Sequence, residues 1–218
     1  VLAVQRLRQC MNFLCQYNKE KGFGYKFAME SKPNEPRGHT YMSTTGNYLA
    51  FIETLDHPEM VGVNPEFAHE SMAGLNFVHH VGQAIERGKL FHIDLNDQEF
   101  NRFDQDYRFG SINYKMAFYL VKLLYDHGYS GMKHFDAHAF RTSDWDDVIE
   151  FARGCMRTYK ILEAKAKQFN EDKEIQQILA SLHNEDQQFT DLTGAYSSDN
   201  AEKLLAQSFD RQKLADRR

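Results

Sequence analysis

The sequence predicts an α/β fold with a parallel sheet, followed by a region made only of helices. In the first 150 residues the spacing of apolar residues alternates four times between the periods of a helix and a strand. After residue 151 only narrow helical stripes remain. We therefore expect a β/α domain over residues 1–150 and a helical C-terminal arm over residues 151–218.

Four segments have the composition of strands, which is aromatic or apolar and bounded by turn formers. They cover residues 25–30 (YKFAME), 60–63, 90–95 (LFHIDL) and 133–137. Pro33 closes the first, and Asn64 with Pro65 ends the second. Because helices lie between them, the connections are expected to cross over and leave the strands parallel.

The helices are predicted from apolar residues spaced three or four apart. In the first helix Val4, Leu7, Met11 and Leu14 share one face, and Gly22 ends the helix shortly after residue 21. The others are expected over residues 45–55, 71–87, 113–127, 155–169, 174–183 and 201–214.

Composition limits the class of protein and its partners. A formal charge of −5 and a pI near 6.1 provide no basic surface, so neither nucleic acid nor an anionic membrane is an expected partner. Cys10, Cys15 and Cys155 have no zinc or redox spacing, which is typical of reduced thiols. Without a run of about 18 apolar residues, the expected location is the cytoplasm. The first residue is Val rather than Met, so we expect that the start of the gene product lies upstream.

Acidic residues follow the predicted strands. Glu30, Glu66, Asp94 and Asp136 each lie at or near the carboxyl end of one strand, where ligands bind in parallel α/β proteins. Clustered carboxylates repel one another, so such a group is stable only around cations. Oxygen ligands favour hard cations such as Mg²⁺ or Mn²⁺.

A second set of ligands extends this pattern. His69 follows Glu66 by three residues, and Asp104 and Asp106 share a face of an extended loop. Glu66 is then placed to bridge two metals.

Each residue alone has a simpler interpretation. Single acids at strand ends often cap helices or turns. His92 is expected to be a hydrogen-bonded core residue, and Lys32 can simply face solvent. The polar residues His134, Asp136 and His138 on one strand face resemble a hydrolase metal motif.

Five blocks of sequence together resemble the xylose isomerase family, the aldose–ketose isomerases with a TIM barrel. The blocks are residues 27–38 (FAMESKPNEPRG), 62–77 (GVNPEFAHESMAGLNF), 89–96 (KLFHIDLN), 103–110 (FDQDYRFG) and 134–136 (HFD). The resemblance covers four of the eight strands of such a barrel and its C-terminal arm. It implies a half barrel.

The resemblance also implies a role for each candidate residue. Glu30, Glu66, Asp94 and Asp136 would hold a structural metal that chelates the open-chain sugar, which makes Glu30, Asp94 and Asp136 substrate-binding residues as well. Glu66, His69, Asp104 and Asp106 would hold a catalytic metal and its water. Lys32 would hydrogen-bond the sugar carbonyl oxygen, so the expected catalytic residues are Lys32, His69 and Asp106.

The expected cofactors are two divalent cations, Mg²⁺ first and Mn²⁺ or Co²⁺ as alternatives. The expected reaction is a hydride shift between C2 and C1 that interconverts D-xylose and D-xylulose, or D-glucose and D-fructose.

The chain departs from the family pattern. The family's ring-opening His and Asp pair and the aromatic walls of its sugar pocket belong to the other barrel half, and Trp145 does not replace them. His138 stands where the family usually has Lys. Four strands also leave two open edges and an apolar face, so we expect a homodimer, or a higher oligomer, that closes the barrel.

Three functions are compatible with the sequence. The first is an active isomerase assembled by association. The second is a non-catalytic metal-binding or oligomerisation module, or a fragment that needs a separate N-terminal half. The third is another metal-dependent barrel enzyme, such as an epimerase or a phosphodiester hydrolase, against which the block at residues 62–77 argues by resemblance.

Overall fold

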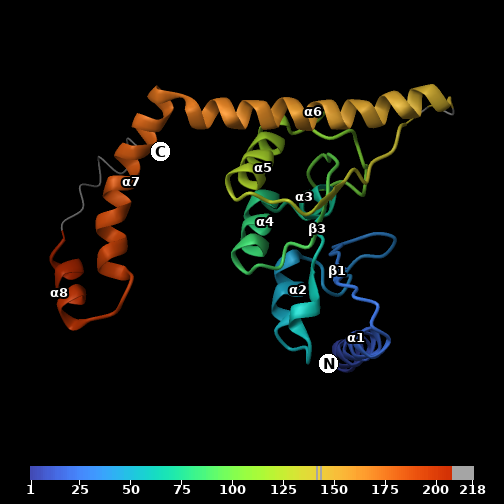
Figure 1. The fold of residues 1–218 in the computed structure, drawn as a ribbon, viewed down its shortest axis with the longest axis horizontal. Coiled ribbons are helices and arrows are strands. Elements are labelled where there is room, and N and C mark those ends of the chain that lie inside the picture. The colour runs from blue at the N-terminus through green and yellow to red at the C-terminus, as the bar shows by residue number, and fades with distance from the viewer. Residues whose placement is uncertain (141, 143, 208–218) are drawn as a thin grey trace. The chain divides into compact units, whose positions relative to one another are not determined.

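A computed structural model of the chain describes residues 1–140, 142 and 144–207 (Figure 1). Its elements in chain order are α1 (Leu2–Lys21), β1 (Phe27–Met29), α2 (Thr45–Ile52), the 3₁₀ helix η1 (Pro58–Met60), β2 (Val61–Val63), α3 (Phe67–Met72), α4 (Phe77–Glu86), β3 (His92–Asp94), α5 (Tyr114–Asp126), β4 (Met132–His134), α6 (Trp145–Glu171), α7 (Lys173–Thr193) and α8 (Ser198–Ala206). The chain therefore mixes helices with a few short strands, as the alternating periods predict.

The strands pair in parallel and in chain order. β1 pairs with β2, and β3 pairs with β4, both in parallel. Isolated parallel bridges between Val63 and Leu90 and between Glu66 and Asp94 continue the pairing from the β2 segment to the β3 segment. The carboxyl ends of all four strands consequently lie along one edge, which is what brings the acidic residues together.

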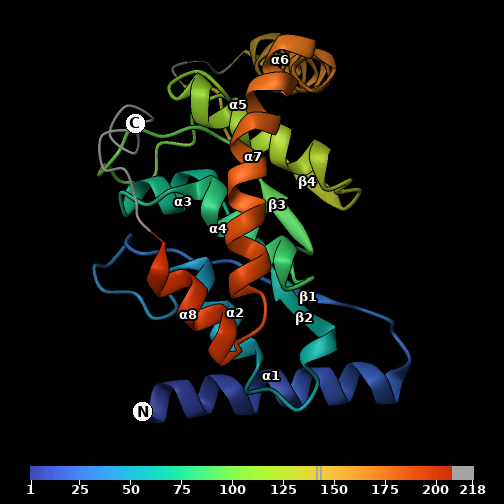
Figure 2. The ribbon, with the colours of Figure 1, turned by 90° about the vertical axis from the view of Figure 1, so that its left-hand side faces the viewer.

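The helices α2, α4 and α5 follow one another along one side of the strands (Figures 1 and 2). Their apolar residues form two buried clusters. One cluster joins α3, α4, β3, α5 and α6 and includes Phe67, Phe77, Ile93 and Leu120. The other joins α1, α2, β2 and α4 and includes Met11, Ile52 and Val63. These clusters anchor the strands, and the acidic residues lie at or near the strand ends.

The helix predicted over residues 71–87 is wrong in its extent. The structure has two helices here, α3 and α4, and the chain turns between them at Gly74, whose φ of +71° is left-handed. Asn76 then begins α4, because its side chain accepts a hydrogen bond from the backbone N–H of His79. The apolar periodicity continues across this break, which is why the spacing alone suggests one helix.

After β4 the regular elements among the described residues are all helices, as expected for the C-terminal region. α6 begins at Trp145, well before the predicted start at residue 155. α7 extends to Thr193, beyond the predicted end at residue 183. The predicted helix over residues 201–214 overlaps α8, and its part beyond residue 207 lies outside the described residues. The chain divides into two compact units, Val1–Lys167 and the part from Gln168 onward.

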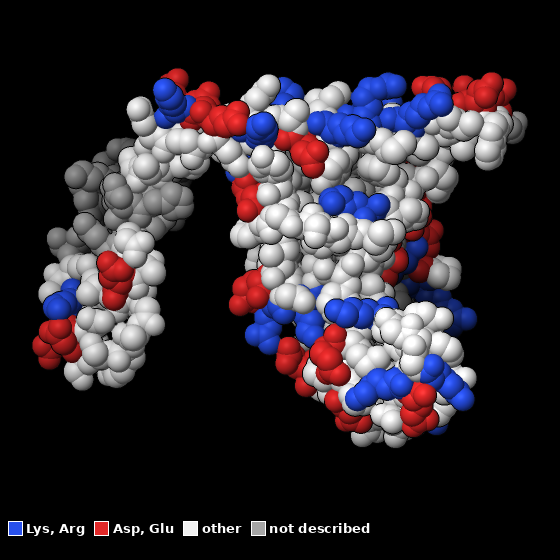
Figure 3. All heavy atoms as spheres, in the orientation of Figure 1, with Lys and Arg blue, Asp and Glu red and all other residues white. Residues whose placement is uncertain are grey.

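Charges of both signs are interspersed over α6 on the face drawn in Figure 3. No continuous basic stripe is therefore visible on that helix face. Among the described helices, none combines the length and the apolar content that crossing a bilayer requires.

Substitution of Gly62 by alanine is expected to destabilise the fold by about 1–3 kcal/mol, as overpacking of a filled core does. A Cβ at this position would contact the Phe91 ring and lie 2.6 Å from the Lys89 carbonyl oxygen, which accepts the Val63 N–H. Chemical denaturation measures the change. Gly38→Ala is the matched control, since nothing lies within 4 Å of the Cβ that this substitution would add. Equal stability of both variants would contradict the packing argument.

Candidate metal centre

The acidic residues approach one another because the strand ends do. Glu30 directly follows β1, Glu66 precedes the first residue of α3, and Asp94 is the last residue of β3. Asp136 follows β4 by two residues. The bridge between Glu66 and Asp94 places two of these acids side by side on neighbouring segments.

Within the described part of the chain, three groups of side chains could hold a metal ion, and every group contains Glu66. In each group one ligand atom per residue lies within 4.8 Å of the others. The groups are Glu66, Asp94 and Asp136; Glu66, Asp104 and Asp106; and Glu30, Glu66 and His69. Glu66 is thus the residue that all three groups share, and one group joins Glu30 and His69 from the two predicted ligand sets.

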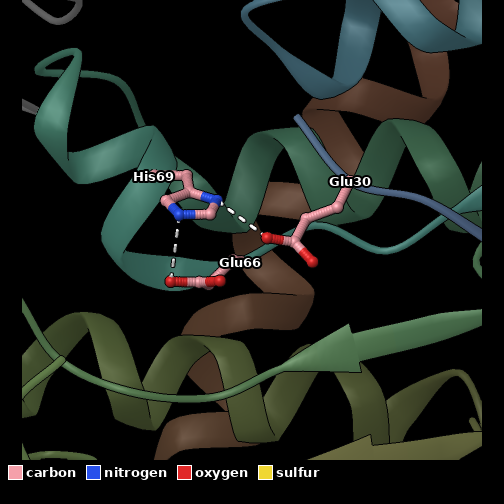
Figure 4. Close-up of side chains that lie close together, drawn as sticks. All are labelled: Glu30, Glu66 and His69. Atoms are coloured by element: carbon pink, nitrogen blue, oxygen red, sulfur yellow. Dashed lines mark ion pairs between the residues drawn. The ribbon is translucent and has the colours of Figure 1, made fainter. Parts of the chain in front are cut away.

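His69 connects the two predicted ligand sets (Figure 4). Its Nδ1 lies 3.3 Å from a carboxylate oxygen of Glu30, and its Nε2 lies 3.3 Å from Glu66. The same Nε2 lies 3.1 Å from Asp104. The resemblance assigns His69 and Glu30 to different metals, whereas here the His69 ring contacts Glu30 directly through one nitrogen and Glu66 through the other (Figure 4).

Glu66 is the most buried acid of the centre. Only 1% of the residue is exposed, and its burial, followed by the charges of Asp104, Glu30 and Asp106, raises its pKa to about 10. The hydrogen bond from Asn96 opposes this shift. A carboxyl in this position carries a negative charge at neutral pH only if a cation supplies the counter-charge.

Several buried ligand atoms lack hydrogen-bond partners, which tests whether the residues fit a cation. These atoms are Glu66 Oε2, Asp104 Oδ1 and His69 Nδ1, whose contact with Glu30 lacks hydrogen-bond geometry. Unpaired buried polar atoms are rare in proteins because each costs free energy. Oxygen and imidazole atoms of this kind are ligands for divalent cations, so the residues fit the implied metals.

Lys32 lies at this centre rather than in open solvent. Its Nζ is 2.6 Å from Asp104 and 3.5 Å from Glu35. Burial lowers the pKa of Lys32, but the hydrogen bond and charge of Asp104 outweigh it and raise the pKa. Lys32 therefore remains a charged hydrogen-bond donor beside the candidate metal ligands.

The pKa values of the two aspartates in the second group shift in opposite directions. Burial raises the pKa of Asp104, but hydrogen bonds from His69 and Lys32 outweigh it and hold this pKa well below its usual range. Burial and the neighbouring Asp104 charge raise the pKa of Asp106 to about 6. Asp106 also has a left-handed φ of +46°, a conformation that costs free energy in residues with a side chain.

The loop that carries Asp104 and Asp106 is held by two buried polar residues. Asp97 pairs with Tyr107 through backbone hydrogen bonds of 3.0 Å, and its side chain accepts from the N–H groups of Ile112 and Asn113. Gln98 accepts from the Gln105 N–H at 2.8 Å and donates to carbonyls within the loop. The position of both aspartates thus depends on these contacts.

Three further histidines singled out in the sequence lie near the acids, whereas Trp145 is exposed. His92 Nδ1 lies 2.8 Å from Asn64 Oδ1, and His92 is absent from the three described metal groups, in keeping with a hydrogen-bonded role. His134 Nδ1 lies 3.0 Å from Asp94. His138 Nδ1 lies 3.6 Å from Asp106. Trp145 is 74% exposed at the start of α6.

Sequence reasoning missed three buried polar residues around the ligands. Asn64 and Asn96 donate hydrogen bonds to the acids, and Glu70 accepts from the backbone and hydroxyl of Thr45 at 2.8 and 2.6 Å. Glu70 also lies 3.1 Å from His80. The sequence places both asparagines next to strand ends, which could have indicated a role in the site. Polar residues are also common there as turn formers, so this position alone does not distinguish the two roles.

The fold and site define an α/β protein with a candidate metal centre at the carboxyl ends of its parallel strands. No family model matches the chain. Curated proteins named xylose isomerase are nevertheless similar to it over most of its length. The chain is 60% identical to that of Thermus thermophilus over 177 residues, which are 81% of this chain and 46% of the relative.

Two further relatives agree. A xylose isomerase of Thermus caldophilus is 57% identical over 198 residues, or 91% of this chain and 51% of the relative. One of Streptomyces lividans is 50% identical over 179 residues, or 82% of this chain and 45% of the relative. The resemblance to the xylose isomerase family is thus confirmed, and the chain spans about half the length of the curated relatives it matches.

The metal-free protein is expected to lose stability as pH rises. The pKa of Glu66 is about 10 in the folded chain against 4.5 for an ordinary Glu. Between these values the folded state keeps a proton that the unfolded state has released. The free energy of unfolding should therefore fall by up to about 1.4 kcal/mol per pH unit.

Glu66→Gln removes this titration, so its stability should depend less on pH. Urea denaturation in the presence of a chelator at pH 6 and pH 8 measures the difference. The same pH dependence in both proteins would show that Glu66 is not the group responsible.

Proposed function

We propose that this chain carries the metal centre of an aldose–ketose isomerase that interconverts D-xylose and D-xylulose, and also D-glucose and D-fructose. The observation that supports it is the convergence of the implied ligands on Glu66, in a chain 50–60% identical to curated xylose isomerases. The proposed cofactors are two divalent cations, Mg²⁺ or alternatively Mn²⁺ or Co²⁺.

The carboxylates would hold the cations and thereby the sugar. Glu66 lies in one group with Asp94 and Asp136, in a second with Asp104 and Asp106, and in a third with Glu30 and His69. When bound, the cations would polarise the two sugar oxygens between which the hydride shift takes place.

Lys32 would donate a hydrogen bond to the sugar carbonyl oxygen. Its Nζ already lies beside the candidate ligands, 2.6 Å from Asp104. A positive donor at that position stabilises negative charge that develops on the oxygen during the reaction. His69 and Asp106 would support the second cation.

The active form would need more strands than this chain contributes. Among the described strands, β1 and β4 each pair with one neighbour, and Met132 on β4 is 70% exposed. Exposed edges and apolar side chains favour association. We propose that a half TIM barrel is completed by a second copy of the chain in a homodimer or larger oligomer.

A second candidate function is a metal-binding half barrel without catalysis, or a piece that needs a separate N-terminal half. The chain's coverage of only 45–51% of its relatives favours this alternative. Both candidates share the metal centre and differ in turnover.

The setting proposed for this reaction is the cytoplasm. Cys10, Cys15 and Cys155 are free thiols, which suits a reducing compartment. The proposed small-molecule partner is an aldose.

Activity separates the two candidates. Purified chain incubated with D-xylose and Mg²⁺, Mn²⁺ or Co²⁺ is expected to form D-xylulose, and a chelator should abolish the product. Sedimentation of the same samples gives the mass of the active species, which should be at least twice that of one chain. Metal binding without product in any of the three metals would favour the non-catalytic module, and activity in a monomer would contradict the proposed assembly.

Two substitutions test the assigned roles. Glu66→Gln is expected to weaken binding of both cations about tenfold or more, because this residue belongs to every metal group and a neutral amide lacks the negative charge. Lys32→Ala should leave cation binding within about twofold and lower turnover by roughly two orders of magnitude, as loss of a charge-stabilising donor does. Calorimetry and xylulose formation measure the two effects; equal loss of metal in both variants would contradict the roles.

A further inference from the structure

Asn96 lies at the junction of the candidate metal centre. The residue is fully buried, with 0% exposure, and follows the ligand Asp94 by two positions. Its side-chain Nδ2 lies 2.8 Å from Glu66 Oε1 and 2.9 Å from Asp106 Oδ1. It also lies 2.9 Å from the backbone oxygen of Asp136. One amide therefore contacts three of the implied ligand residues.

The hydrogen bond that the Asn96 side-chain oxygen accepts determines the orientation of the amide. Asn96 Oδ1 accepts a hydrogen bond of 2.8 Å from the backbone N–H of Ala68, in the first turn of α3. With the oxygen engaged there, the NH₂ group must face the acids. Two N–H hydrogens then serve three acceptors, so all donor capacity of Asn96 is directed at the centre.

The contacts leave a specific part of Glu66 for a cation. Asn96 donates to Oε1, while Oε2 of the same carboxylate is buried and without a hydrogen-bond partner. A neutral amide orients the carboxylate without adding a positive charge that would repel a metal. A cationic donor at this place would compete with the cation for the same carboxylate.

Asn64 makes similar contacts to two other acids of the centre. Its Nδ2 lies 3.1 Å from Glu30 Oε2 and 2.6 Å from Asp94 Oδ2. Its Oδ1 faces His92 Nδ1 at 2.8 Å. The two asparagines thus contact different acids, Asn64 those of one ligand set and Asn96 the bridging Glu66 with Asp106.

We propose that Asn96 is a positioning residue that holds Glu66 between two cations and couples Glu66 to Asp106. The inference rests on the proposed function, because it assumes that the centre binds two cations. It assigns to Asn96 a role in cation binding that differs from a general contribution to folding.

The test compares Mn²⁺ binding by wild-type protein, Asn96→Leu and a control. Leucine has the same heavy-atom branching as asparagine but neither a donor nor an acceptor, so the variant loses the contacts to Glu66, Asp106 and Asp136 and the acceptor for the Ala68 N–H without leaving a cavity. Calorimetry measures affinity, and electron paramagnetic resonance detects the magnetic coupling of two Mn²⁺ ions that share a carboxylate. We expect Asn96→Leu to weaken at least one Mn²⁺ site tenfold or more and to lose the coupled signal.

Asn76→Ala is the matched control, since Asn76 caps α4 through the His79 N–H and is absent from the described metal groups. Its loss should lower the melting temperature and leave Mn²⁺ affinity and coupling unchanged. If circular dichroism shows that Asn96→Leu is unfolded, the same measurements are made on Asn96→Ala, because truncation to alanine adds no new contact. Loss of affinity and coupling in Asn96→Ala then supports the inference.

Two results would overturn the inference in different ways. If the wild type binds two Mn²⁺ ions and the folded Asn96 variant binds them with the same affinity and coupling, Asn96 has no positioning role and the proposed function stands. If the wild type binds no Mn²⁺, the proposed metal centre itself is refuted.

Discussion

The burial of the Glu66 carboxyl among other acids is the constraint on which the rest of the site depends. A carboxylate removed from water, with neighbouring charges of the same sign, is unstable unless it is protonated or paired with cations. The structure raises the pKa of Glu66 to about 10 and leaves Oε2 without a partner. The fold therefore buries a carboxyl that ionises at neutral pH only if a cation compensates its charge.

The parallel strands explain how such an unfavourable cluster can form at all. The helices and their two apolar clusters stabilise the strands, so the strand ends hold the acids in place despite their repulsion. Loops add further constraints, since Asp97 and Gln98 organise the segment with Asp104 and Asp106. Stability supplied by the core thus offsets the electrostatic cost of the site, as is common for functional sites.

The buried amides refine this picture. Asn64 and Asn96 satisfy some carboxylate oxygens and leave others unpaired. Hydrogen bonds from neutral groups reduce repulsion between acids and still allow a cation to bind. Such outer contacts orient metal ligands in many proteins. The lysine beside Asp104 adds a positive donor at the edge of the same centre.

The sequence by itself determined the alternation of helices and strands, the acids at the strand ends and the resemblance to xylose isomerases, because periodicity and motif order are local properties. It did not show the break at Gly74, since the apolar spacing continues through it. It also did not show that His69 lies between Glu30 and Asp104 or that Asn96 donates to Glu66. Those contacts join residues distant in the chain, and only the pairing of strands and the packing of loops bring them within hydrogen-bond distance.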